Sequence, residues 1–131
     1  MNKQVVVVDD EQDILDMLRR AFTLEDIDCI CFNDSVEALE FIKKNNNMIA
    51  VIDIKMPKMS GIQLLNEIKK YNPLCNIIII TGFSSMARVV ECLGGGAIDY
   101  FVKPFKTTDD IIVALKQCME RLNRWEEAIS K

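Results

Sequence analysis

The sequence contains no histidine among its 131 residues. This absence excludes catalytic triads built on histidine, histidine-ligated zinc, and a phosphohistidine formed within the chain. The chemistry of any site must therefore depend on carboxylates, hydroxyls and lysines.

Long apolar runs and a basic charge balance are also missing. No apolar run approaches the roughly 18 residues that a membrane span requires. The start at Met1–Gln4 leads directly into an apolar run, so we expect no signal peptide. The net charge of −4 argues against a nucleic-acid-binding surface, because such surfaces are usually basic. We expect a cytoplasmic protein whose domain contacts neither membrane nor nucleic acid directly.

The five cysteines do not have the spacing of a disulfide framework. We interpret them as small hydrophobic residues in a reducing compartment. Cys29 and Cys31 lie on one face of an expected strand, but no further ligands for a metal stand near them in the sequence. A metal site at this pair is therefore not predicted.

Short apolar runs alternate five times with amphipathic segments, which predicts five βα units. The runs are 4–8, 28–32, 49–53, 76–81 and 97–102. Strands that are apolar throughout are typical of parallel sheets buried on both faces. A chain of this length forms one domain, so we predict an α/β fold: a doubly wound (βα)5 three-layer sandwich around a five-stranded parallel sheet.

Each amphipathic segment carries apolar residues at helical spacing. The residues expected to face the core are Ile14, Met17, Leu18, Ala21 and Phe22; Ala38, Phe41 and Ile42; Leu64, Leu65 and Ile68; Met86, Val89, Val90 and Leu93. Asp34 is an expected N-cap, and Ser60 with Gln63 forms a capping-box pattern. The glycines 94–96 follow a helix and precede a strand, which indicates a helix C-cap rather than a phosphate-binding loop.

The last helix is unusually long. It is expected to begin near Thr107 or Thr108 and to run to about Ile129, a length of roughly 33 Å at 1.5 Å per residue. A helix that only covers a five-stranded core can be shorter than this. Three interpretations stay open: a solvated helix end, a dimerisation helix, or a linker to an output domain.

Polar residues stand where four of the apolar runs stop. Asp9 and Asp10 follow the first run, Asp53 the third, Thr81 the fourth and Lys103 the fifth. Taken singly, such residues are common as caps and turns. Because parallel sheets bind ligands at the carboxyl ends of their strands, we expect these side chains to share one crevice.

The expected carboxylates favour a divalent cation. Like charges about 4 Å apart repel by roughly 4 kcal/mol at an effective dielectric constant near 20, so the group must bind a cation or hold protons. Oxygen ligands without histidine or cysteine indicate Mg²⁺ or Mn²⁺. Asp53 is a candidate nucleophile, since aspartates form aspartyl-phosphate intermediates. Lys103, kept extended by Pro104, is a candidate phosphate ligand.

Four segments resemble the receiver domain of two-component response regulators (CheY-like). They are Val-Val-Asp-Asp-Glu (7–11), Val-Ile-Asp-Ile-Lys-Met-Pro (51–57) with Gly61, Ile-Ile-Thr-Gly (79–82), and Gly-Ala-Ile-Asp-Tyr-Phe-Val-Lys-Pro-Phe (96–105). The resemblance covers about residues 3–122 and implies the flavodoxin-like strand order 2-1-3-4-5. We therefore expect a receiver domain over 1–122 and a helical extension over 123–131 that is a candidate linker to an output domain.

The resemblance also implies a role for each residue of the crevice. Asp53 would accept a phosphoryl group from the phosphohistidine of a partner kinase or phosphotransfer protein. Asp10, Asp53 and the Lys55 carbonyl would bind Mg²⁺, with Asp9 acting mostly through water. Lys103 and Thr81 would contact the phosphoryl oxygens.

Three further positions concern switching and phosphate lifetime. In the family, the residue matching Thr81 moves toward the phosphate and the aromatic residue matching Tyr100 turns inward. This remodels the face formed by helix 4, strand 5 and helix 5. Lys55 and Phe83 match the positions that tune hydrolysis, and the ring at Phe83 is expected to lengthen the phosphoryl lifetime.

The implied function is a phosphorylation-dependent switch in a phosphorelay, which catalyses only its own phosphorylation and dephosphorylation. Its expected partners are the kinase, a downstream protein or output domain, and a second copy on phosphorylation. A haloacid-dehalogenase-type phosphatase would need an acid at Lys55, and a flavin mononucleotide binder would need a phosphate loop where Asp9–Glu11 stand. A receiver-like scaffold that acts without phosphorylation stays open, as do the cognate kinase and the output.

Overall fold

The computed structural model describes residues 1–82 and 85–130. Its strands form one parallel sheet in the order β2-β1-β3-β4-β5, which confirms the expected fold and strand order. The strands are β1 (Asn2–Val8), β2 (Cys29–Phe32), β3 (Asn47–Asp53), β4 (Asn76–Thr81) and β5 (Asp99–Val102). The expected runs place the strands correctly, although β1 and β3 begin two residues earlier and β5 begins two residues later than predicted.

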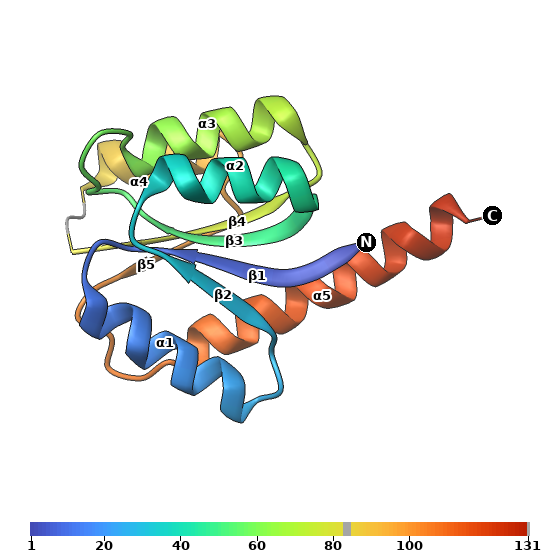
Figure 1. Ribbon diagram of the computed structural model, residues 1–131, viewed down its shortest axis with the longest axis horizontal. Coiled ribbons are helices and arrows are strands. Elements are labelled where there is room, and N and C mark those ends of the chain that lie inside the picture. Colours follow the sequence, from blue (N-terminus) through green and yellow to red (C-terminus); the bar gives the residue numbers. More distant parts are fainter. Residues whose placement is uncertain (83–84, 131) are drawn as a thin grey trace.

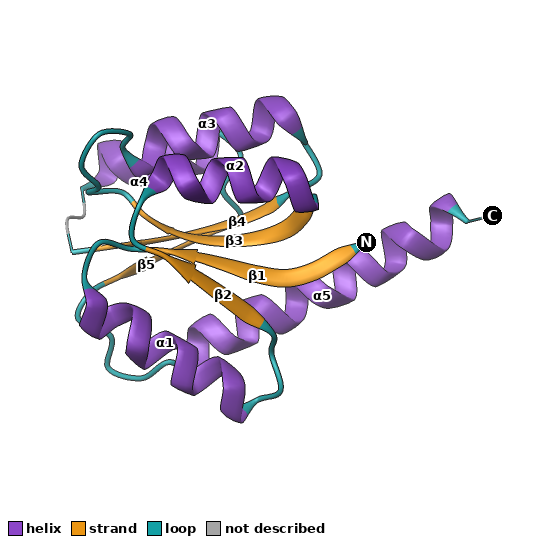
Figure 2. Ribbon diagram, in the orientation of Figure 1, coloured by secondary structure: helices purple, strands orange, loops and turns teal. Residues whose placement is uncertain are grey.

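Helices cover both faces of this sheet, which gives three layers (Figure 1). The helices α1 (Gln12–Leu24) and α5 (Asp109–Ile129) lie on one face, and α2 (Ser35–Asn45), α3 (Gly61–Tyr71) and α4 (Met86–Gly94) lie on the other. Figure 2 shows the strictly alternating order of strands and helices along the chain. None of the helices in the described part of the chain is both long and apolar enough to cross a bilayer.

The core has two halves because successive strand side chains point to opposite faces of the sheet. Val5 and Val7 pack with α1 and α5, whereas Val6 and Val8 pack with α2 and α3. All seven residues of β3 and all six of β4 are buried. These two interior strands end at the buried residues Asp53 and Thr81, at the carboxyl edge of the sheet.

Helix ends follow the expected capping chemistry. Asp34 accepts from the backbone N–H groups of Val36 and Glu37, and Ser60 forms the predicted capping box with Gln63. The glycines after α4 end that helix, with Gly95 as C-cap and Gly96 at φ +108°. The phosphate-loop interpretation of this run is thereby excluded by position as well as by sequence.

The predicted core face of α4 is wrong. Met86, Val90 and Leu93 are 78%, 62% and 44% exposed, and of the helix only Cys92 is buried. The helix is rotated so that the neighbouring stripe of Arg88, Val89 and Cys92 faces the protein. A nine-residue helix with apolar residues on most of its circumference has two stripes of equal spacing, and packing alone decides between them.

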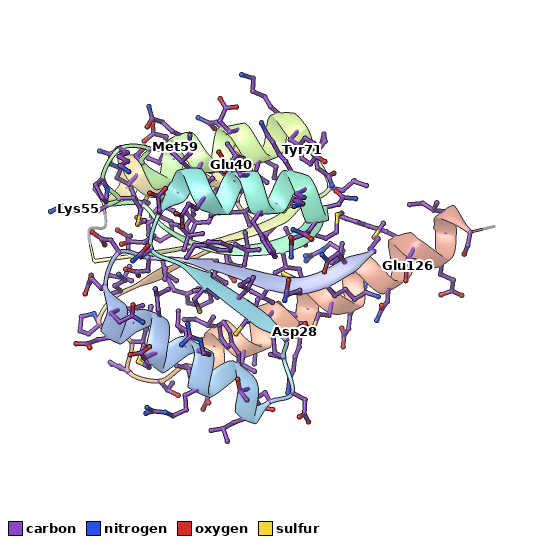
Figure 3. All side chains as sticks on the ribbon, in the orientation of Figure 1. Asp28, Glu40, Lys55, Met59, Tyr71 and Glu126 are labelled. Carbon is purple, nitrogen blue, oxygen red and sulfur yellow. The ribbon has the colours of Figure 1, made fainter. Side chains whose placement is uncertain are left out.

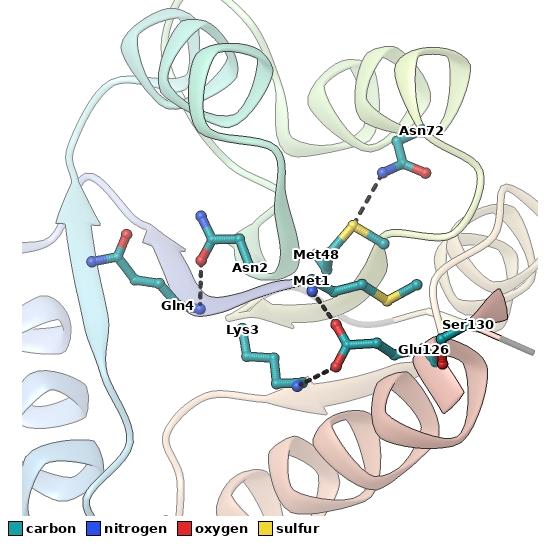
Figure 4. A network of polar contacts seen from close by, with 8 residues as sticks. All are labelled: Met1, Asn2, Lys3, Gln4, Met48, Asn72, Glu126 and Ser130. Carbon is teal, nitrogen blue, oxygen red and sulfur yellow. Dashed lines mark hydrogen bonds and ion pairs between the residues drawn. The ribbon is translucent and has the colours of Figure 1, made fainter. Parts of the chain in front are cut away.

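The helix α5 continues beyond the sheet (Figure 1). Leu122 is buried and Trp125 still packs against the core, but Ile129 is 69% exposed. Figure 4 shows how the start of β1 meets this helix: the Met1 amino group and the Lys3 ammonium both contact the Glu126 carboxylate, the latter at 3.4 Å. The extension thus leaves the domain beside the N-terminus.

Candidate functional site

The polar residues predicted at the strand ends meet at the carboxyl edge of the sheet. Val8 is paired with Ile52 and Thr81 with Val102 in the parallel ladders, so the residues that follow these strands are neighbours. The adjacent strands β1 and β3 lead into α1 and α3, which lie on opposite faces of the sheet. Doubly wound sheets bind ligands at such a switch point. Asp9, Asp53, Thr81 and Lys103 come together here.

Lys103 links the carboxylates of the site. Its ammonium nitrogen lies 2.6 Å from Asp9 Oδ2, 3.1 Å from Glu11 Oε1 and 3.4 Å from Asp53 Oδ2. The Lys103 side chain is 8% exposed, and its peptide bond to Pro104 is cis. A lysine 50 residues from Asp53 in the sequence therefore places its charge within the acidic crevice.

The acidic residues are close enough to share one cation. Asp9, Asp10, Glu11 and Asp53 each offer a carboxylate oxygen, and these oxygens all lie within 4.8 Å of one another. Asp9 and Asp53 are buried, whereas Asp10 and Glu11 are exposed. An all-oxygen donor set with two solvent-facing members fits a hard cation that retains water ligands, such as Mg²⁺.

Burial and mutual repulsion perturb the acid–base behaviour of the site. Burial and, to a smaller extent, the charge of Asp9 together raise the pKa of Asp53 to about 6, although Lys103 opposes this. Burial likewise raises the pKa of Asp9, although the ion pair with Lys103 opposes this. Burial alone would lower the pKa of Lys103, but the hydrogen bond and charge of Asp9 outweigh it and raise that pKa. The crevice therefore holds excess negative charge.

The crevice opens into a cavity of about 420 Å³. Its lining residues are Asp10, Glu11, Asp53, Lys55, Thr81, Gly82 and Lys103. The Lys55 N–H donates to Asp53 Oδ1 at 3.4 Å, while its side chain points outward into solvent (Figure 3). A second cavity of about 410 Å³ also has Lys55 and Thr81 in its wall, and reaches Ser60 and Arg88. Thr81 thus borders both spaces.

The predicted switch residue Tyr100 does not line this cavity. Tyr100 is partly buried on β5 and packs against the half of the core that α2, α3 and α4 cover. Phe83, expected to influence phosphate lifetime, falls outside the described residues.

A tight turn after β3 holds Asp53 in position. The Gly61 N–H donates to the Ile54 carbonyl at 2.8 Å, which folds the loop back onto the end of the strand. A Cβ at Gly61 would lie 2.1 Å from the Asp53 carbonyl oxygen and 2.6 Å from Ile54 Cα. Such distances are impossible between non-bonded atoms, so this position requires glycine.

Sequence reasoning missed Glu11 as a member of the site. Glu11 occupies the N-cap position of α1, but its side chain makes no capping hydrogen bond and instead pairs with Lys103. Its N–H donates to Asp9 Oδ1 at 2.9 Å. The signal was available, since Glu11 is the third acid of the Val-Val-Asp-Asp-Glu segment and a weak N-cap residue type.

Comparisons with known proteins identify relatives of this chain. The family model described as "Response regulator receiver domain" matches residues 5–116. The DNA-binding transcriptional regulator NtrC of Escherichia coli (strain K12) is 37% identical over 101 residues, which are 77% of this chain and 22% of that protein. Regulatory protein AtoC of the same strain is 33% identical over 78% of this chain and 22% of its own length. The chain thus spans about a fifth of these curated relatives.

Two solved structures support the same family at the level of the fold. A response regulator receiver domain protein from Clostridium thermocellum superposes with a TM-score of 0.86 at 31% identity, covering 93% of this chain and 98% of the other. The beryllofluoride-activated NtrC4 receiver domain dimer superposes with a TM-score of 0.85 at 29% identity, covering 91% and 98%. The likeness therefore extends over nearly the whole chain.

Proposed function

This chain belongs to the response regulator receiver domain family, and from that membership and the acidic crevice we propose that Asp53 accepts a phosphoryl group and thereby switches the domain. The observation that carries the proposal is the position of Asp53: a buried carboxylate at the end of a fully buried strand, 3.4 Å from the Lys103 ammonium and in the wall of a cavity of about 420 Å³. The donor is a phosphohistidine of a partner kinase or phosphotransfer protein.

The transfer joins one Asp53 carboxylate oxygen to phosphorus. The bond between phosphorus and the donor imidazole nitrogen breaks, and that nitrogen takes up a proton from solvent. Lys103 contacts the transferred oxygens as a point charge, and its positive charge helps to keep Asp53 ionised and nucleophilic near neutral pH, where the pKa of about 6 permits it.

A divalent cation fits the same crevice. Asp10, Asp53 and the Lys55 carbonyl would hold it, with Asp9 acting through water, and the proximity of the carboxylate oxygens supports this assignment. Bound Mg²⁺ supplies positive charge that offsets repulsion between the acidic residues and the anionic phosphoryl group. Mn²⁺ prefers similar oxygen ligands and would substitute for it.

Thr81 and Tyr100 form the switch in this proposal. Thr81 borders both the acidic cavity and the neighbouring cavity that Arg88 also lines, and its hydroxyl moves toward a phosphoryl oxygen on phosphorylation. Tyr100 then turns inward and changes the face of α4, β5 and α5. A nearly complete shift between two states needs roughly 5.5 kcal/mol of differential stabilisation, part of which the charged contacts of Lys103 provide.

Two further roles remain predictions. Lys55, at the mouth of the cavity, and Phe83 are proposed to restrict access of the hydrolytic water and so to tune the phosphoryl lifetime. Residues 1–122 are proposed to form the receiver domain, and residues 123–131 the beginning of a linker to an output domain or downstream partner. The domain itself is a signalling switch rather than an enzyme acting on other substrates.

Phosphotransfer from a small donor tests the proposed acceptor. The chain incubated with acetyl phosphate and Mg²⁺ is expected to gain the mass of one phosphoryl group, and Asp53→Asn is expected to abolish the gain. Asp26→Asn is a matched control, because Asp26 is exposed, remote from the crevice, and at a left-handed φ of 57° that asparagine tolerates. Phosphorylation of the Asp53→Asn protein at the usual rate would refute the assignment.

A further inference from the structure

The Glu11 carboxylate lies at the mouth of the acidic crevice and pairs with the lysine that a phosphoryl group must reach. Its Oε1 is 3.1 Å from Lys103 Nζ, nearer than Asp53 Oδ2 at 3.4 Å. The Glu11 side chain is 61% exposed, whereas those of Asp9 and Asp53 are 0% and 4% exposed. Of these three carboxylates around Lys103, Glu11 is therefore the one that can turn away into solvent.

The local backbone directs Glu11 toward Lys103 rather than along its own helix. Glu11 is the N-cap residue of α1 with an extended backbone, and its N–H donates to Asp9 Oδ1 at 2.9 Å. Serine, threonine, aspartate and asparagine are the side chains that cap helices well, and Glu11 makes no capping hydrogen bond. Its own helix thus does not hold the carboxylate, and the ion pair with Lys103 places it over the crevice.

This ion pair opposes the binding of an anionic phosphoryl donor in two ways. The Lys103 ammonium has three donors and already faces three carboxylates, so a phosphoryl oxygen must displace one of them before transfer. The Glu11 carboxylate also lies in the wall of the cavity that the donor must enter, where like charges repel. Asp10 lines the same cavity, but in the proposed function it holds the divalent cation. The Lys55 side chain points outward and does not offset the charge of Glu11.

We propose that Glu11 is a specificity-determining residue that selects phosphoryl donors by their charge. It slows transfer from doubly charged acyl phosphates. It favours donors that carry the phosphoryl group on a nitrogen base, whose proton offsets part of the phosphoryl charge, and a phosphoimidazole is such a donor. Because this preference concerns transfer to Asp53, it rests on the proposed function.

Acetyl phosphate and phosphoramidate represent the two classes of donor. At pH 7 acetyl phosphate is a dianion, whereas phosphoramidate is a monoanion because its nitrogen is protonated. In both reactions a bond forms between an Asp53 carboxylate oxygen and phosphorus. With acetyl phosphate the bond from phosphorus to the acetyl oxygen breaks and acetate leaves. With phosphoramidate the phosphorus–nitrogen bond breaks and ammonia leaves, so both donors give the same acyl phosphate.

The rates at which Glu11→Gln reacts with the two donors test the proposal. Glutamine keeps the shape of the side chain and removes its charge. Because repulsion is proportional to the charge of the donor, we expect transfer to become about tenfold faster from acetyl phosphate and only about threefold faster from phosphoramidate. Mg²⁺ is kept at a concentration that saturates each variant, as established by titration. Glu40→Gln makes the same chemical change on the exposed side of α2, away from the cavity, and should leave both rates unchanged.

Ionic strength separates charge repulsion from a structural effect of the substitution. At about 1 M salt the Debye length is only about 3 Å, so exposed charges at the mouth of the cavity are largely screened. The advantage of Glu11→Gln with acetyl phosphate is therefore expected to fall toward one as salt is added. No acceleration with acetyl phosphate, equal acceleration with both donors, or an advantage that salt does not reduce would overturn the proposal.

A nuclear magnetic resonance measurement tests the ion pair without any phosphorylation. The Lys103 side chain is 8% exposed, which slows exchange of its ammonium protons with water. In EDTA, the ammonium signal of Lys103 in a proton–nitrogen correlation spectrum is expected to shift in Glu11→Gln and to stay in place in Glu40→Gln. An unchanged signal in Glu11→Gln would overturn the proposal while leaving the role of Asp53 intact. Failure of the proposed function gives a different result, because neither donor would then phosphorylate the unmodified chain, and both proposals would fall.

Discussion

At the scale of single residues, the site depends on how one ammonium group is shared. Lys103 contacts the buried carboxylates of Asp9 and Asp53 and the exposed carboxylate of Glu11, which is 61% exposed. Buried and exposed ion pairs contribute very differently to stability, because water screens the exposed pair. Glu11 therefore orients Lys103, whereas Asp9 and Asp53 depend on its charge.

Replacing Lys103 and Glu11 separately should show this difference. Lys103→Met leaves the buried carboxylates without a cation and is expected to lower the free energy of unfolding by about 3 kcal/mol at pH 7 in EDTA. Glu11→Gln is expected to cost less than about 1 kcal/mol. Urea unfolding measures the free energy of unfolding of both variants. Equal losses would show that the exposed ion pair between Glu11 and Lys103 contributes as much to stability as the buried ones.

The raised pKa of Asp53 predicts a pH-dependent stability. Its pKa is about 6 in the folded chain against 3.8 as the reference value, so folding favours the protonated form. The stability that this residue provides is fully present below about pH 4 and is lost as the pH rises through about 6. At pH 7 in EDTA, Asp53→Asn is therefore expected to stabilise the fold by about 3 kcal/mol.

Urea unfolding of the Asp53→Asn and unmodified chains between pH 4 and pH 7 measures this effect. The advantage of the variant should shrink on acidification, because the aspartate of the unmodified chain then becomes neutral in the fold. An advantage that grows as the pH falls would contradict the assigned environment of Asp53.

At the scale of elements, the turn between β3 and α3 determines where the acceptor stands. Gly61→Ala would force a methyl group into the backbone of Asp53 and Ile54. The expected cost is about 2–3 kcal/mol of stability, together with slower phosphorylation because the strand end must move. Gly94→Ala in α4 is the control, since nothing lies within 4 Å of its Cβ position. An unchanged phosphorylation rate in Gly61→Ala would show that the turn does not position Asp53.

The elements also show how far sequence patterns determine the structure. The strand β4 has the predicted bounds and β3 ends where predicted, because both strands are buried on both faces. The caps at Asp34 and Ser60 follow from local hydrogen bonding. The orientation of α4 was predicted wrongly, because a short helix with two apolar stripes does not encode which one the sheet will cover. Glu11 and Lys103 are 92 residues apart in the sequence. Hydrophobic periodicity is a local pattern and does not show which distant residues will be in contact.

At the scale of the whole molecule, the order of the strands could be predicted from family resemblance but not from periodicity. Alternating strands and helices indicate a doubly wound sheet, whereas the neighbours of each strand depend on the crossover directions. Once the order β2-β1-β3-β4-β5 is given, the convergence of Asp9, Asp53 and Lys103 follows from the ends of the strands.

The protruding α5 leads to a prediction about assembly. With Ile129 exposed and Trp125 only partly buried, the end of α5 offers an apolar strip, and the similar NtrC4 receiver domain is described as a dimer when activated by beryllofluoride. We expect beryllofluoride with Mg²⁺ to shift this chain from monomer toward dimer in analytical ultracentrifugation. Ile129→Asp with Trp125→Gln should weaken the shift. A monomer under both conditions would refute a phosphorylation-dependent dimer.

The central claim is that Asp53 carries the phosphoryl group as an acyl phosphate. Borohydride reduces an acyl phosphate on aspartate to homoserine, so peptide mass spectrometry after phosphorylation and reduction identifies the residue that carried it. We predict homoserine at position 53 and unmodified aspartate at positions 9 and 10. Homoserine at either of those positions, or at none in a chain that has gained phosphate, would contradict the account.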